Sequence, residues 1–113
     1  MPHPAIFPPD AARRRPHQRG FSLPYVNRQT GSSHFTIHMS VINPGERAHP
    51  PHDHPDEEVL FLLEGAAEAL IGDHTEVIGV DTAVFCPPNV THGLRNVGGT
   101  PLRYLVIRTG AAS

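Results

Sequence analysis

The sequence contains no lysine and no tryptophan, and Cys86 is its single cysteine. The absence of lysine excludes a catalytic imine, and a lone cysteine cannot form a disulfide within the chain. Glycine-rich nucleotide loops and nucleophile motifs are missing as well, which argues against hydride transfer and covalent hydrolysis. The longest apolar run, residues 59–63, is too short to cross a membrane. We therefore expect a cytoplasmic protein without a membrane partner.

Charge is low and unevenly distributed along the chain. The nine basic side chains are all arginine, and with eleven acidic ones they give a net charge of -2. This balance provides no basic field for nucleic acid, so we expect no nucleic-acid partner. Ten of the eleven acidic residues lie between positions 46 and 81. The middle of the chain is therefore where a cation is expected to bind.

What the sequence does have is turn residues, with 13 prolines and 10 glycines among 113 residues. This length suits one folded unit, and the many turn residues favour short strands over long helices. Residues 1–24, rich in proline and arginine, are expected to form an N-terminal arm. The arm is either a mobile tail or an extended strap that docks on the rest. Residues 25–113 are expected to form a single domain.

Hydrophobic periodicity predicts about eight strands and no helix. Residues 34–42 alternate apolar and polar side chains, as a strand with one buried face does. Residues 59–63 are apolar on both faces, which is typical of a barrel wall covered from outside, so we expect a homodimer. Further strands are expected at residues 67–71, 75–78, 82–86, 90–96 and 102–108.

Histidines and carboxylates are concentrated in residues 49–58. On a strand, His52 and His54 project to the same face, because side chains alternate with a period of two. Glu58 follows after a turn, and His92 begins a later strand. Nitrogen and carboxylate donors suit one divalent transition metal ion: iron, zinc, manganese, nickel or copper. A hydrated histidine-rich loop is the alternative. His49 has the opposite parity to His52, so on a regular strand it points away.

Two spaced motifs resemble those of the cupin family. The first comprises Gly45, His52-x-His54, Glu58 and Gly65, and the second is Pro87-x-Asn89-x-x-His92-x-x-x-Asn96. The resemblance spans residues 34–109 and implies a small antiparallel, jelly-roll-like β-barrel with a metal at its mouth. It implies that His52, His54, Glu58 and His92 are the metal ligands. Asn89 stands where the family has glycine, and asparagine tolerates the left-handed backbone expected there.

The resemblance implies a metal-dependent enzyme that acts on a small oxygenated molecule. Dioxygenases, isomerases or lyases, decarboxylases and cyclases all remain open, because a fold does not choose a reaction. The alternative is a module that binds a small ligand without turnover. Three residues are candidates for handling protons or holding an anion: Arg95, Tyr104 and Glu57. Other candidates for the barrel interior are Arg47, Arg108 and His38, and each of these side chains is equally open to a solvated role.

Overall fold

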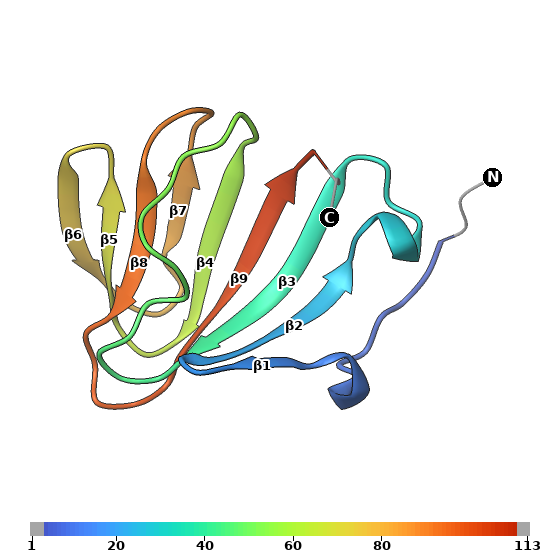
Figure 1. Ribbon diagram of the computed structural model, residues 1–113, viewed down its shortest axis with the longest axis horizontal. Coiled ribbons are helices and arrows are strands. Elements are labelled where there is room, and N and C mark those ends of the chain that lie inside the picture. The colour runs from blue at the N-terminus through green and yellow to red at the C-terminus, as the bar shows by residue number, and fades with distance from the viewer. Residues whose placement is uncertain (1–3, 111–113) are drawn as a thin grey trace.

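The structure is a computed structural model that describes residues 4–110, and within this range it holds nine strands and two short 3-10 helices (Figure 1). The strands are β1 (Arg15–His17), β2 (Gly20–Val26), β3 (Phe35–Ile42), β4 (Glu58–Glu64), β5 (Ala67–Ile71), β6 (His74–Ile78), β7 (Ala83–Cys86), β8 (His92–Asn96) and β9 (Leu102–Thr109). The helices are η1 (Ala11–Arg13) and η2 (Arg28–Thr30). In this described range, no helix has the length and hydrophobicity needed to cross a membrane.

The strands form two antiparallel sheets that face each other (Figure 1). The larger sheet has the order β1-β2-β3-β9-β4-β7, and the smaller has the order β6-β5-β8. The predicted all-β jelly-roll fold is confirmed. Across residues 4–110, however, no continuous strand ladder closes the two sheets into a barrel, and an isolated bridge pairs His52 with His92.

The segment expected as an N-terminal arm supplies part of the larger sheet. Strand β1 pairs with β2, and β2 pairs with β3 along most of its length. The register shifts between Pro24 and Val26, as it does at a β-bulge. The predicted boundary between residues 24 and 25 therefore falls inside β2. The division of the chain into arm and domain stays a prediction.

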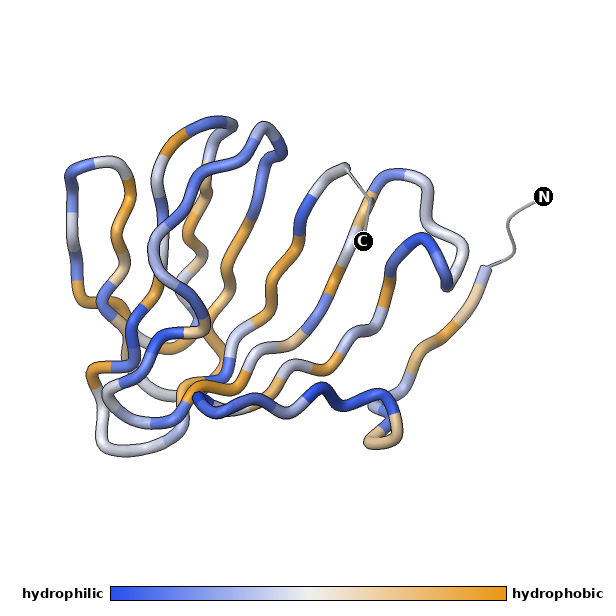
Figure 2. Tube along the Cα trace, in the orientation of Figure 1, coloured by the Kyte–Doolittle hydropathy of each residue, from blue (hydrophilic) through white to orange (hydrophobic). Residues whose placement is uncertain are grey.

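The hydrophobic core lies between the two sheets, and β4 shows why. Its alternating residues Leu60 and Leu62 are 5% and 0% exposed, whereas Val59 and Phe61 lie half-buried on the outer face. Figure 2 shows that the adjacent strands β4 and β9 of the larger sheet are rich in hydrophobic residues. At one end, the side chains between the sheets are completely packed, with Ile42 and Leu102 at 1% and 0% exposure. Polar side chains concentrate toward the other end.

Asn96 closes the packed end of the sandwich from within. Its side chain is fully buried, and its Nδ2 donates hydrogen bonds to the carbonyls of Ile42 at 2.9 Å and Thr100 at 2.8 Å. Its Oδ1 accepts from the backbone N–H of Gly98 at 2.9 Å. One amide thus satisfies three backbone groups from two separate connections. The last residue of the second motif is therefore a structural anchor.

The turn before β8 has the backbone that the sequence predicts. Asn89 has a φ of 62°, in the left-handed region, as expected of a residue in a glycine position. Asp81, in the connection between β6 and β7, has a φ of 64°. Asparagine and aspartate adopt this conformation more readily than other non-glycine residues. The turn at Asn89 sets the direction in which β8 and its first residue, His92, enter the small sheet.

Candidate metal centre

A reciprocal pair of backbone hydrogen bonds holds His52 beside His92. The His52 N–H donates to the His92 carbonyl at 3.0 Å, and the His92 N–H donates to the His52 carbonyl at 2.9 Å. His92 is the first residue of β8, whereas His52 lies in the loop before β4. Residues directly opposite each other in an antiparallel pair share a face. The bridge therefore brings the two imidazole rings to the same side.

The four residues predicted as ligands come together in space. Each of His52, His54, Glu58 and His92 offers one ligand atom, and these atoms all lie within 4.8 Å of one another. Glu58 is the first residue of β4, and its carboxylate lies close to the rings of both His54 and His92. Its Oε2 is 2.9 Å from His92 Nε2, and its Oε1 is 3.6 Å from His54 Nε2. This cluster could hold a metal ion.

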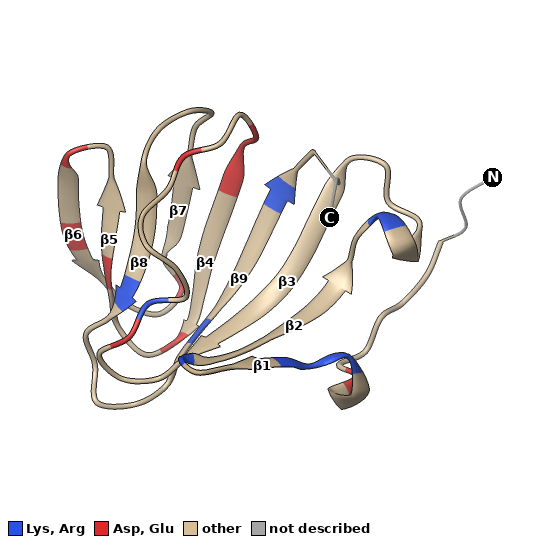
Figure 3. Ribbon diagram, viewed as in Figure 1, with Lys and Arg blue, Asp and Glu red and all other residues tan. Residues whose placement is uncertain are grey.

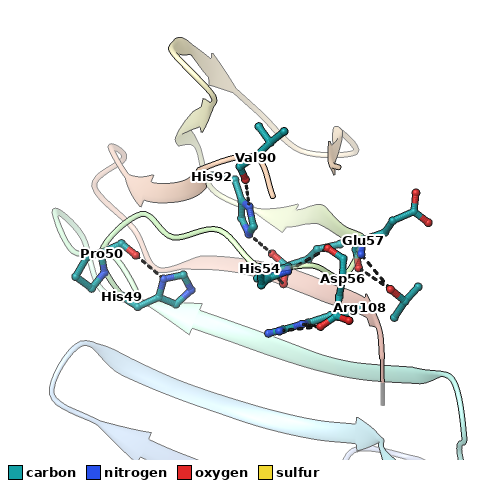
Figure 4. Close-up of polar contacts among 10 residues, drawn as sticks. His49, Pro50, His54, Asp56, Glu57, Val90, His92 and Arg108 are labelled. Atoms are coloured by element: carbon teal, nitrogen blue, oxygen red, sulfur yellow. Dashed lines mark hydrogen bonds and ion pairs between the residues drawn. The ribbon is translucent and has the colours of Figure 1, made fainter. Parts of the chain in front are cut away.

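Backbone carbonyls orient two of the rings (Figure 4). His54 Nδ1 lies 3.0 Å from the carbonyl of Asp56, and His92 Nδ1 lies 3.0 Å from the carbonyl of Val90. A carbonyl only accepts, so each Nδ1 carries the hydrogen and each Nε2 keeps its lone pair. Such contacts fix the tautomer and direction of metal-binding histidines. Both Nε2 atoms are thus directed into the cluster as donors to a cation.

The chemistry of the cluster fits a transition metal ion. The Nε2 atoms of His52, His54 and His92 are buried and, among the described residues, have no hydrogen-bond partner. Glu58 Oε2 lies 2.9 Å from His92 Nε2, but with the hydrogen on Nδ1 this nitrogen has none to donate to the carboxylate. Burying three unpaired nitrogens around a carboxylate is costly unless a cation joins them. Three imidazoles and one carboxylate are a donor set for zinc, iron, manganese, nickel or copper.

Electrostatics keep His52 in the form that can bind a metal. Burial, followed by the proximity of His49 and His92, lowers the pKa of His52 to about 4. The ring is therefore neutral near pH 7, and only a neutral imidazole has a lone pair for a metal. The Glu58 carboxylate opposes this shift, but burial and the neighbouring histidines outweigh it.

His49 lies against the cluster rather than pointing away from it. Its ring stacks on that of His52, with centroids 4.0 Å apart and an interplanar angle of 25°. The expectation of opposite faces assumed a regular strand, whereas only His52 in this proline-rich segment makes a bridge. His49 Nδ1 lies 2.8 Å from the carbonyl of Pro50 (Figure 4). The ring thus covers one side of His52.

The cluster opens onto a cavity of about 290 Å³ between the sheets. Its walls come from both sheets, chiefly β2, β3, β4, β8 and β9, and they include His52, Glu58 and His92. This volume suits a small molecule rather than a polymer. A molecule that fills the cavity would contact His52, Glu58 and His92.

Three of the interior candidates line this cavity: His38, Tyr104 and Arg108. Burial lowers the pKa of His38, opposed by Glu58 and assisted by nearby arginines. Burial raises the pKa of Tyr104 above its usual value. Arg108 donates two hydrogen bonds to Asp56 Oδ2, from Nε at 3.1 Å and from Nη2 at 2.9 Å. Near neutral pH the wall thus offers a neutral imidazole and a protonated phenol.

The other candidates lie outside this cavity. Arg95 and Arg47 line a separate hollow of about 110 Å³, where Arg95 Nε is 3.9 Å from Glu68 Oε1. Strand parity explains this, because His92 and Leu94 face inward and Arg95 must then face outward. Glu57 is exposed, and its side chain points away from the cluster (Figure 4). Glu58, and not Glu57, joins the histidines.

Cys86 is inert in this arrangement. It is fully buried opposite Glu58 in the β4–β7 pair. Burial, with a smaller contribution from the Glu58 carboxylate, raises the pKa of its thiol to about 12. The raised pKa disfavours a thiolate near neutral pH, and Cys86 is not among the clustered ligand residues.

Sequence reasoning missed several residues that line the cavity. Arg15 and Ser22 come from the expected arm, and Ser40 comes from β3. No motif marks them, because their position depends on pairing between strands far apart in sequence. One local signal existed, for Ser40. The alternation within residues 34–42 places Ser40 on the face of the strand opposite to the half-buried apolar residues.

Comparison with known proteins identifies the family. Residues 38–108 match the cupin domain, and the chain therefore belongs to the cupin family. Mannose-1-phosphate guanylyltransferase RfbM of Salmonella typhimurium is 30% identical over 76 residues, which are 67% of this chain and 16% of that protein. The polyketide synthase CurC of Streptomyces cyaneus is 30% identical over 74 residues, 65% of this chain and 47% of that protein. The chain spans less than half of either relative.

Solved structures share the fold. The polyketide cyclase RemF from Streptomyces resistomycificus has a TM-score of 0.73 and 24% identity, covering 91% of this chain and 73% of that one. An RmlC-like cupin from Shewanella frigidimarina has a TM-score of 0.80 and 16% identity, covering 100% of this chain and 97% of that one. At these identities the likeness concerns the fold alone.

Proposed function

We propose that His52, His54, Glu58 and His92 hold one divalent transition metal ion, and that the chain is a metal-dependent cupin enzyme acting on a small oxygenated molecule. The observation that carries the proposal is the set of three buried, unpartnered Nε2 atoms around one carboxylate, beside a cavity. A metal bound there would supply Lewis acidity toward a carbonyl or enol oxygen. The relationship to the polyketide synthase CurC is consistent with such a substrate.

The cavity wall supports proton transfer as the chemistry. His38 is neutral and can accept a proton, and Tyr104 keeps its proton and can donate one. His38 pairs with Val106, two residues from Tyr104 on the same inner face of β9, so the two side chains are diagonal neighbours. Glu58, held in the cluster, is not free to act as a base. An isomerase, lyase or cyclase reaction on a carbonyl compound therefore suits the site best.

Turnover should depend on both the metal and this wall. We expect metal-loaded protein to catalyse deuterium exchange from solvent into small 1,3-diketones, measured by proton NMR, and a chelator to abolish it. The variants H38Q and Y104F should lower kcat roughly 100-fold or more with metal content unchanged. The matched control is Y25F, because Tyr25 belongs to β2 and does not line the cavity.

The outcomes separate the candidate functions. Full turnover by protein shown to be metal-free would refute the metal-dependent mechanism. Oxygen consumption without exchange would replace proton transfer by a dioxygenase reaction. Tight binding of a diketone with neither exchange nor oxygen uptake would favour the non-catalytic module.

We also propose that a second copy of the chain covers the outer face of the larger sheet. A row of apolar residues crosses four strands there, because Phe85 pairs with Val59, Val59 with Ile107, and Ile107 with Ile37. Phe85 is 54% exposed. A contiguous apolar row on the outer face of a sheet is a candidate surface for contact with a second copy.

Sedimentation at micromolar concentration should therefore show twice the 12.3 kDa chain mass. F85E should shift the protein to monomer, because the charge would lie unpaired in the interface. V77E is the control, since Val77 is 65% exposed but belongs to the smaller sheet. A monomeric wild type would refute the dimer.

A further inference from the structure

One row of the larger sheet presents polar side chains to the cavity. Arg15 pairs with Ser22, Ser22 with Ser40, and Ser40 with Tyr104. Directly paired residues in antiparallel strands share a face, and all four line the cavity. The row therefore runs from the edge strand β1 to the central strand β9 and carries one guanidinium and three hydroxyl groups.

The row formed by Arg15, Ser22, Ser40 and Tyr104 is rich in hydrogen-bond donors and contains no carboxylate that could accept from them. A guanidinium donates only, and each hydroxyl donates one hydrogen bond. Ser40 and Tyr104 are 3% and 4% exposed, so water reaches this part of the row poorly. Among the described residues that line the cavity, the one carboxylate is that of Glu58, which belongs to the histidine cluster.

Arg15 is the cation of the cavity without a protein counter-ion. Arg108, the other arginine in its wall, is paired with Asp56 at 2.9 Å. In the described part of the chain, no carboxylate lies within ion-pair distance of Arg15. Figure 3 shows the basic residues of η1 and β1 gathered along the edge of the larger sheet. Arg15 is an exposed residue of the edge strand β1 that lines the cavity. After burial, the positive charges of Arg15 and Arg108 contribute to the lowered pKa of His38.

We propose that Arg15 binds the anionic group of a small organic acid, a carboxylate, with Ser22 as an additional donor. The ligand would then lie between this row and the histidine cluster, so that the substrate class is an oxygenated organic anion. This inference rests on the proposed function: whether the bound acid is converted depends on the metal-dependent activity proposed above. Arg15 and Ser22 lie outside residues 38–108, the part of the chain that matches the cupin domain.

The test compares benzoate with its neutral analogue benzamide by isothermal titration calorimetry, on metal-free and zinc-loaded protein. We expect benzoate to bind the wild type more tightly than benzamide does. R15Q should weaken benzoate binding roughly tenfold to a hundredfold, the value of a hydrogen bond to a charged group, and leave benzamide unaffected. R15K should recover part of the affinity, because it keeps the charge but loses the guanidinium fork.

The matched control is R14Q. Arg14 is the adjacent residue, and its Cζ lies 4.0 Å from the ring centroid of Phe21 instead of lining the cavity. R14Q should leave benzoate affinity unchanged. Circular dichroism and metal analysis of each variant verify the fold and the cluster.

Each result decides the proposal. Equal benzoate affinity in R15Q and wild type, equal affinity for benzoate and benzamide, or no benzoate binding at millimolar concentration would overturn it. If the Arg15 dependence is found in a protein that binds no metal, the anion site stands and the metal-dependent function fails. If metal binds normally but R15Q has no effect, the anion site fails and the metal-dependent function stands.

Discussion

H92A is expected to lose metal binding and, with it, the stabilisation that metal gives the wild type. His92 is 1% exposed, and its Nε2 lies 2.9 Å from the Glu58 carboxylate. Without this ring, the cluster retains two imidazoles and a carboxylate and gains a void. A ligand that binds only the folded state at a thousandfold excess over its Kd stabilises the protein by about 4 kcal/mol. We expect that increment in the wild type and almost none in H92A.

Elemental analysis and thermal unfolding with and without zinc measure this effect. H74A is the control, because His74 lies in β6 with its side chain 70% exposed. Its Nε2 is 3.2 Å from Glu76 Oε1, away from the histidine cluster. H74A should bind metal as the wild type does. Metal content near one equivalent per chain in H92A would show that the ion lies elsewhere or needs fewer ligands.

N96A is expected to destabilise the fold by about 3 kcal/mol, independently of metal. The substitution leaves two carbonyls and one N–H without partners at the packed end of the sandwich. Each buried unsatisfied group costs about 1–3 kcal/mol, and water entering the space left by the side chain offsets part of the sum. For a domain of this size, the loss corresponds to a Tm lower by roughly 15 °C.

Calorimetry on metal-free N96A tests this directly. N43A is the control, since Asn43 is exposed at the end of β3 and should change Tm little. A Tm within a few degrees of the wild type in N96A would mean that the buried amide is dispensable. The motif position would then need another explanation, such as a role in the approach to the histidine cluster.

The strands that follow residue 34 were predictable from local patterns, although the pattern did not always show which face is buried. Residues 35–42 form the expected strand, but its buried residues are Ser40 and Ile42, whereas Phe35, on the face expected to be buried, is 51% exposed. Asn89 adopts the left-handed backbone that its place in the motif requires. Strands β1 and β2 were not predicted. Pro16 and Pro24 argue against strands, and the sequence cannot show that an edge position and a bulge accommodate them.

The histidine cluster was predictable from spacing, whereas the rest of the cavity was not. Two histidines at i and i+2 carry a local signal, and the family motifs connect them with Glu58 and His92. Arg95 could have been excluded from the interior by counting from His92 along β8. Arg15 could not have been included, because its position depends on long-range pairing that no local pattern encodes. The ligand role of the four residues stays a prediction.

The solitary buried thiol makes the β4–β7 edge of the sheet individually observable. Cys86 is fully buried, and its pKa of about 12 keeps it unreactive while β7 remains paired with β4. Because Cys86 is the one cysteine of the chain, alkylation reports on this position alone, and the buried thiol must first become exposed by local opening or global unfolding. Its rate therefore reports local opening next to Glu58. A metal ion bound to the histidine cluster would therefore slow the alkylation of Cys86, and no label has to be introduced to measure this rate.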